Sequence, residues 1–143
     1  MASDLSPRLL AIVDALPLRQ GMRVLEIGCG PGAAAREIAR RLGDGHVLAI
    51  DRSAKAIAQA RAASHAELAA GRLSLRQVAI EDFELEADER HFDMAIAVRV
   101  GALDGRHPEA GKIALQRLGA ALTAQGRLFI DGGDPLCEIV LDG

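Results

Sequence analysis

The sequence has few aromatic side chains: among its 143 residues there are three Phe and neither Trp nor Tyr. Single-stranded nucleic acids bind proteins largely by stacking their bases on aromatic rings, so this chain offers little surface for stacking. Its formal net charge of −3 at pH 7 provides no basic excess that would attract a phosphate backbone. We therefore expect no nucleic-acid partner.

Cysteine is scarce as well, and long apolar runs are missing. Cys29 and Cys137 form no CxxC pair and no cluster with the spacing of metal ligands, which predicts two reduced thiols and no metal site. No apolar stretch approaches the ~20 residues of a membrane span. Residues 1–14 lack the basic and then apolar pattern of a secretory signal, because Asp4 and Asp14 interrupt it. These features predict a cytoplasmic protein without a membrane partner.

Half of the residues are hydrophobic, and their pattern predicts one domain, residues 1–143, in which helices and strands alternate. Such alternation is typical of an α/β fold with a parallel sheet and right-handed crossovers. The predicted helices span Leu5 to Leu16, Pro31 to Leu42, Ser53 to about Gly71, and Glu109 to Leu122. The predicted strands span Arg23 to Ile27, His46 to Ile50, Leu73 to Ala79, Phe92 to Val98, and Arg127 to Ile130.

The most informative feature is a strand that runs into a glycine-rich turn, followed by a second strand that ends in a carboxylate. Residues 24–35 are VLEIGCGPGAAA and residues 47–51 are VLAID. Glycines let the backbone come close to a ligand. Asp51 follows Gly28 at about the 20-residue spacing of nucleotide-binding βαβ units, in which the acid accepts hydrogen bonds from a ribose. The pattern predicts a Rossmann-like, doubly wound, mostly parallel sheet with the strand order 3-2-1-4-5.

The string EIGCGPG, residues 26–32, resembles the first motif of class I S-adenosylmethionine-dependent methyltransferases. The looser dinucleotide pattern is also met by Gly28, Gly30 and Ala33, but it does not account for Glu26 or Gly32. The resemblance extends along most of the chain. Asp51 matches the ribose-binding acid, residues 81–83 match the segment flanking the adenine, residues 92–97 match the fourth-strand motif, and residues 126–130 match the fifth strand.

The resemblance implies S-adenosylmethionine as the cofactor and methyl transfer to a small-molecule acceptor. In this family the glycine loop wraps the methionine half of the cofactor, and Glu26 fixes the loop or meets the amino group through water. Asp82 would accept from the adenine amino group, and Phe83 would pack on the ring. The implied cofactor-binding residues are Glu26, Gly28, Cys29, Gly30, Gly32, Asp51, Arg52, Glu81, Asp82, Phe83 and Ala97, with Cys29 as a small filler rather than a nucleophile.

Each of these residues also has a purely structural interpretation. The glycines could form only a tight turn, and Glu26 could merely accept from loop amides. Asp51 could be a helix cap that acts together with Ser53, the expected N-cap. Residues 81–83 could be a charged loop with one buried Phe.

The segment from Ala97 to His107 is where this family places substrate groups, and here the sequence departs from the best-known subfamilies. It has neither an Asn-Pro-Pro-Tyr motif nor a Pro-Cys nucleophile, and no acidic metal triad is evident. The polar groups in this segment are Arg99, Asp104, Arg106 and His107. His107 is a candidate general base, with a solvated loop His as the alternative, so no catalytic residue is assigned. Methyl transfer to a good acceptor relies mainly on alignment, closeness and desolvation.

The tail, Cys137 to Leu141, is apolar and β-branched enough for a strand. We predict that it turns back at Gly132 and Gly133 and pairs antiparallel beside Arg127 to Ile130, which would cover the open edge of the sheet. Where the tail fails to cover this edge, two chains would meet there as a homodimer.

Two other functions remain open on the sequence. One is a cofactor-binding or interaction subunit that kept the fold without catalysis. The other is an NAD(P)-dependent oxidoreductase, which is disfavoured because the chain has no second domain to hold substrate over a nicotinamide.

Overall fold

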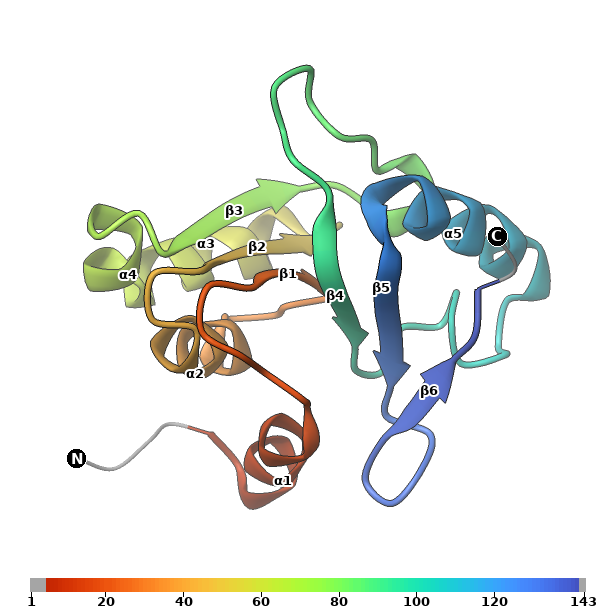
Figure 1. Ribbon diagram of the computed structural model, residues 1–143, viewed down its shortest axis with the longest axis horizontal. Coiled ribbons are helices and arrows are strands. Elements are labelled where there is room, and N and C mark those ends of the chain that lie inside the picture. Colours follow the sequence, from red (N-terminus) through yellow and green to blue (C-terminus); the bar gives the residue numbers. More distant parts are fainter. Residues whose placement is uncertain (1–4, 142–143) are drawn as a thin grey trace.

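The computed structural model describes residues 5–141, which form a six-stranded sheet in the order β3-β2-β1-β4-β5-β6 (Figure 1). All neighbouring strands are parallel except β5 and β6. The α/β class, the order 3-2-1-4-5 and the antiparallel edge strand are thus confirmed. The strands are β1 (Arg23–Ile27), β2 (His46–Asp51), β3 (Leu73–Gln77), β4 (Phe92–Ala97), β5 (Leu122–Ile130) and β6 (Cys137–Ile139).

The central strands are apolar nearly throughout because helices cover both faces of the sheet. Alternate residues enter opposite cores: Val24 and Val47 belong to one buried cluster, whereas Leu25 and Leu48 belong to the other. The first cluster includes residues of α1, α2 and α3, and the second includes residues of α5 and η1 (Figure 1). The helices are α1 (Pro7–Ala15), α2 (Ala33–Arg41), α3 (Ala54–Ala63), α4 (His65–Ala69), η1 (Ile80–Asp82) and α5 (Pro108–Ala121).

The glycine-rich turn is two residues longer than predicted. Pro31 was expected at the first helical position, but it lies in the turn, and α2 begins at Ala33 with Gly32 as its N-cap. The reason is the backbone of Gly32, whose φ of 90° is not helical. The Gly32 N–H donates to the Cys29 carbonyl at 3.1 Å and closes the turn before the helix starts.

The single helix predicted from Ser53 to about Gly71 is divided into α3 and α4. Ser53 is the N-cap of α3 as predicted, since its hydroxyl accepts from the Ala56 N–H at 3.1 Å. The break falls at Ser64, which is fully buried and accepts a hydrogen bond from Arg36 of α2 at 3.0 Å. This tertiary contact outweighs the helical preference of the alanines around it.

The carboxyl-terminal tail returns as predicted. β6 pairs with β5 so that Ile139 lies opposite Leu128 and Cys137 lies opposite Ile130. In Figure 1, β6 lies at the edge of the sheet and runs in the opposite direction to β5. β5 follows α5 directly, and its pairing with β4 is irregular until Arg127, where the predicted strand begins. None of the helices within residues 5–141 has the length and apolar character that crossing a membrane requires.

Candidate functional site

The carboxyl ends of the parallel strands open into a cleft of about 660 Å³. This is the edge at which open α/β sheets bind ligands, at the point where the strand order reverses between β1 and β4. The cleft is lined by Ile27, Gly28, Asp51, Arg52, Val78, Ala79, Ile80, Glu81, Arg99, Val100, Gly101, Ala102, Arg106, His107 and Ala110.

The glycine loop after β1 is held against the end of β2 by backbone hydrogen bonds. The N–H groups of Gly28 and Cys29 both donate to the Ile50 carbonyl, at 2.9 and 3.0 Å. A Cβ added to Gly28 would lie 2.9 Å from the Val100 side chain, so this position admits no larger residue without displacing that side chain. At Gly30, whose φ is 54°, an added Cβ would meet no atom within 4 Å. The loop therefore leaves open space beside Gly30.

Asp51 ends β2 and lies at the centre of this arrangement. Its Oδ2 accepts from the Gly30 N–H at 2.9 Å, and its Oδ1 accepts from the Ser53 N–H at 2.9 Å. The carboxylate also lines the cleft. Each carboxylate oxygen has two lone pairs, so these bonds leave acceptor capacity for a ligand hydroxyl. Asp51 thus contributes to the start of α3, as a helix cap would, and its carboxylate can still accept hydrogen bonds from a ligand in the cleft.

Glu26 lies on β1, two residues before Gly28, with 5% of its surface exposed. Its Oε1 has no hydrogen-bond partner among the described residues. Burial raises the pKa of this carboxyl to about 8, and the negative charge of Asp51 adds to the rise, while Arg36 opposes it. A buried carboxyl oxygen needs a hydrogen-bond partner, so Glu26 Oε1 has acceptor capacity for a ligand or a bound water.

Cys29 is buried beside this carboxyl. Burial, followed by the charges of Glu26 and Asp51, raises the pKa of its thiol to about 12. A thiol with that pKa remains protonated near neutral pH and is a poor nucleophile. This supports the interpretation of Cys29 as a filler.

The opposite wall of the cleft is formed by the loop between β4 and α5. Arg99 is the second residue of this loop, and its φ of 57° lies in the left-handed region that residues other than glycine rarely adopt. Its N–H donates to Asp131 Oδ1 at 3.1 Å, and its carbonyl accepts from Arg106 at 3.3 Å. The ring of His107 lies against Gly101, where an added Cβ would be 2.7 Å from it. The loop is therefore held by specific contacts.

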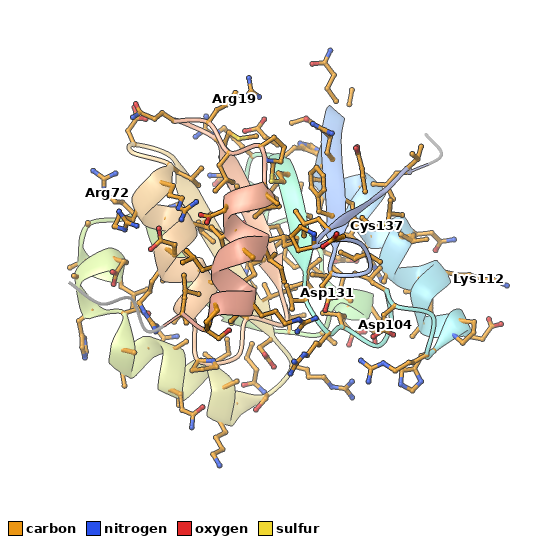
Figure 2. The ribbon with its side chains drawn as sticks, turned by 90° about the horizontal axis from the view of Figure 1, so that it is seen from below. Arg19, Arg72, Asp104, Lys112, Asp131 and Cys137 are labelled. Carbon is orange, nitrogen blue, oxygen red and sulfur yellow. The ribbon has the colours of Figure 1, made fainter. Side chains whose placement is uncertain are left out.

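A second cleft of about 540 Å³ adjoins this loop on the side of β5. It is lined by Arg99, Leu103, Asp104, Arg106, Ile130, Asp131 and Gly132. Figure 2 shows the labelled Asp104 and Asp131 near each other. Asp131 also accepts from Arg8 of α1 at 2.9 Å, so one carboxylate connects the first helix with the loop after β4.

The predicted site residues fall into three groups. Four line the larger cleft, five belong to the glycine loop or are buried beneath it and at the end of β4, and two lie elsewhere. The cleft group is Gly28, Asp51, Arg52 and Glu81; the loop and buried group is Glu26, Cys29, Gly30, Gly32 and Ala97; the remaining two are Asp82 and Phe83.

The role predicted for Phe83 is corrected. Its side chain is 1% exposed and belongs to the core under α5, where its ring centroid lies 6.5 Å from that of Phe92. The Phe83 ring also packs beneath the Arg76 guanidinium at 5.5 Å. The segment instead fits the alternative interpretation, a charged loop with one buried Phe. Burial of a large apolar ring is favourable, and this explains why Phe83 lies in the core. Asp82 is exposed and does not line the cleft.

Comparison with protein families agrees with this geometry. A family model described as a methyltransferase domain matches residues 24–126, well over half of the chain and the segment that contains the glycine loop, Asp51 and the loop after β4. The chain belongs to the methyltransferase domain family. This confirms the resemblance to class I S-adenosylmethionine-dependent methyltransferases. No curated protein sequence matches the chain.

Several solved methyltransferase structures share the fold. A TehB-like SAM-dependent methyltransferase from Corynebacterium glutamicum is 21% identical, with a TM-score of 0.64 over 89% of this chain and 62% of that one. A SAM-dependent methyltransferase from Thiobacillus denitrificans is 23% identical, with a TM-score of 0.67 over 88% and 48%. Haemonchus contortus phosphoethanolamine N-methyltransferase 2 is 24% identical, with a TM-score of 0.69 over 86% and 27%. The chain thus spans between 27% and 62% of the length of these proteins.

Two residues of this methyltransferase domain were missed by the sequence analysis. Arg117 of α5 donates to the Glu81 carbonyl at 3.1 Å and to Glu84 at 2.8 Å, which holds the segment on one side of the cleft. No sequence signal marks it among the other surface arginines. Asp131 could have been found, because it follows β5 directly, as Asp51 ends β2. Among the residues that the structure describes, no three His, Cys, Asp or Glu side chains gather as metal ligands would.

Proposed function

We propose that this methyltransferase domain binds S-adenosylmethionine and transfers its methyl group to a small-molecule acceptor. One observation carries the proposal: the Asp51 carboxylate lines the cleft while it is bonded to the Gly30 N–H of the glycine loop at 2.9 Å. This arrangement supports a role for Asp51 as an acceptor for ribose hydroxyls, beside a loop that admits close approach of a ligand. The family match over residues 24–126 supports the same cofactor class.

The residues present fit this cofactor. Glu26 Oε1 is buried without a hydrogen-bond partner among residues 5–141, and an ammonium group or a water bound to one would satisfy it. The space beside Gly30, which an added Cβ would enter without contact, leaves room for the methionine part. The main-chain wall from Val78 to Glu81 would flank the base. The solved structures from Thiobacillus denitrificans and Haemonchus contortus were determined with S-adenosyl-L-homocysteine and S-adenosyl-L-methionine.

When bound, the cofactor would supply an electrophilic methyl group on a positively charged sulfonium with a good leaving group. The residues of the chain then have three tasks: to fix the cofactor at the glycine loop, to align the acceptor, and to exclude water. Asp51 and the loop would perform the first task. The segment from Arg99 to His107 supplies further lining of the cleft and would perform the second. His107 stays a candidate general base for acceptors that must lose a proton.

Thermal unfolding with and without ligands tests the cofactor. S-adenosylhomocysteine at 100 times its dissociation constant stabilises a protein by about 2.7 kcal/mol. For a chain of this size that corresponds to a rise in Tm of ~2–4 °C per kcal/mol. We expect this rise with S-adenosylhomocysteine and no rise with NAD. A rise with NAD alone would contradict the proposal and favour an oxidoreductase.

Methyl transfer itself requires a separate assay. Labelled S-adenosylmethionine incubated with a metabolite extract should give labelled small molecules with the active chain and none with heat-inactivated protein. Binding of the cofactor without any transfer would leave the non-catalytic subunit as the better description.

A further inference from the structure

We propose that the acceptor of this methyltransferase domain carries an anionic group, a carboxylate or a phosphate, and that the guanidinium of Arg99 binds it. The inference rests on the proposed function, because it concerns the acceptor side of the same cleft.

Arg99 lies where the two clefts meet, since it lines both the larger cleft and the cleft beside β5. Its backbone is fixed on both sides by the bond from its N–H to Asp131 and by the bond from Arg106 to its carbonyl. The left-handed φ of 57° is uncommon for a residue other than glycine, and such conformations cluster at ligand sites. The structure thus holds the backbone of Arg99 at the boundary between the two clefts.

In the cleft beside β5, the charges leave Arg99 as the available cation. Arg106 is paired with Asp104 through contacts of 2.9 and 2.8 Å, and Asp131 is paired with Arg8 at 2.9 Å. No hydrogen bond or ion pair joins the guanidinium of Arg99 to any residue from 5 to 141. A guanidinium presents a planar fork of donors that matches the oxygens of a carboxylate or a phosphate.

The end of α5 adds a second electropositive feature on the same wall. α5 has 14 residues, no side chain caps its N-terminus, and His107 and Ala110 from this end line the cleft. Free N–H groups and the helix dipole favour an anion there. The Asp51 carboxylate lines the same cleft at the end of β2. Arg99 and the uncapped N-terminus of α5 thus border the same cleft.

Calorimetry with simple anions tests this directly. The full chain, loaded with S-adenosylhomocysteine, is titrated with inorganic phosphate and separately with acetate. Arg99→Gln removes the charge, and Arg72→Gln is the matched control, because Arg72 is exposed and lies on the other side of the molecule from Asp104 and Asp131 (Figure 2). We expect Arg99→Gln to weaken anion binding by at least about tenfold, or 1.4 kcal/mol, and Arg72→Gln to leave it unchanged.

Two more variants sharpen the result. Arg99→Lys keeps the charge without the planar fork, so its anion affinity should fall between those of the wild type and Arg99→Gln. Asp104→Asn releases Arg106 from its ion pair and should tighten anion binding. Binding of phosphate without binding of acetate favours a phosphorylated acceptor, and binding of acetate without binding of phosphate favours a carboxylate.

The proposal is overturned if Arg99→Gln and Arg72→Gln bind phosphate and acetate equally well, or if the wild type binds neither anion. S-adenosylhomocysteine affinity, measured for every variant, should remain within about twofold of wild type because Arg99 lies on the acceptor side. Failure of the wild type to bind S-adenosylhomocysteine would count against the proposed function. The anion titrations repeated without it would still decide whether Arg99 binds anions.

Discussion

The carboxylate of Asp51 accepts a hydrogen bond from the backbone N–H of Gly30 at 2.9 Å, and so joins the end of β2 to the loop that follows β1. Its other oxygen accepts from the Ser53 N–H at the start of α3. One side chain therefore fixes the loop, begins a helix and faces the cleft. Mutations have to separate these three roles.

Asp51→Ala should lower the affinity for S-adenosylhomocysteine by at least about tenfold. Hydrogen bonds to a charged group are worth roughly 1.5–3 kcal/mol each, and 1.4 kcal/mol corresponds to tenfold. Isothermal titration calorimetry gives the affinity. Ser53→Ala is the control, because it removes the N-cap bond to Ala56 and leaves the Asp51 carboxylate in place. Equal affinity losses in both variants would reduce Asp51 to a helix cap.

Gly30→Ala tests whether a ligand occupies the space beside the loop. The backbone φ of 54° makes alanine unfavourable there by roughly 1–2 kcal/mol, although the added methyl meets no protein atom. Gly71→Ala is a close control, with a φ of 73° and equally open surroundings. Both variants should lose similar stability in denaturant unfolding. Only Gly30→Ala should lose affinity for S-adenosylhomocysteine, and equal affinities would place the ligand elsewhere.

Glu26 should couple pH to both folding and binding. Its pKa in the folded chain is raised to about 8 from 4.5, mainly by burial. In this pH window the folded chain holds a proton that the unfolded chain has lost, so the free energy of unfolding should fall as the pH rises from about 4.5 to 8. Glu26→Gln should remove this part of the pH dependence in denaturant titrations. A slope that is unchanged by the mutation would show that other groups cause it.

The same carboxyl should release up to one proton when an ammonium-bearing ligand binds at pH 7. Calorimetry of S-adenosylhomocysteine in buffers with different ionisation enthalpies measures this release. Glu26→Gln should abolish it. Release of the same amount from the variant would mean that Glu26 does not face the ligand's amino group.

Phe83→Ala should damage folding rather than binding. Removal of a buried phenyl ring costs about 3–5 kcal/mol of unfolding free energy, and Phe83 is 1% exposed. The affinity of the folded fraction for S-adenosylhomocysteine should stay within about twofold, and Phe83→Leu should show a smaller stability loss of the same kind. A large affinity loss in Phe83→Leu would restore the predicted contact with adenine.

The sheet could be predicted because its strands carry their own signals. Buried parallel strands are continuous apolar runs, and the glycine turn and Asp51 fix which two strands flank the switch point. The short tail was predicted from β-branched residues after Gly132 and Gly133, and it pairs beside β5. Local patterns were sufficient wherever neighbouring residues decided the structure.

The predictions were wrong where residues distant in the sequence decided the local structure. The break at Ser64 depends on Arg36, 28 positions away, and the burial of Phe83 depends on packing beneath α5. The same limit applies to the site. Arg99 was noted only as one of several polar groups, since its left-handed backbone and its bond to Asp131, 32 residues later, have no local pattern.

The two cysteines differ in a way that experiments can use. Cys29 is buried with a pKa of about 12, whereas Cys137 is exposed at the start of β6, opposite Ile130 at the end of β5. A maleimide dye should therefore attach to Cys137 alone, in the native sequence, without engineering. Because Ile130 lines the smaller cleft, the dye would sit beside the acceptor side and give an optical signal when that region is occupied.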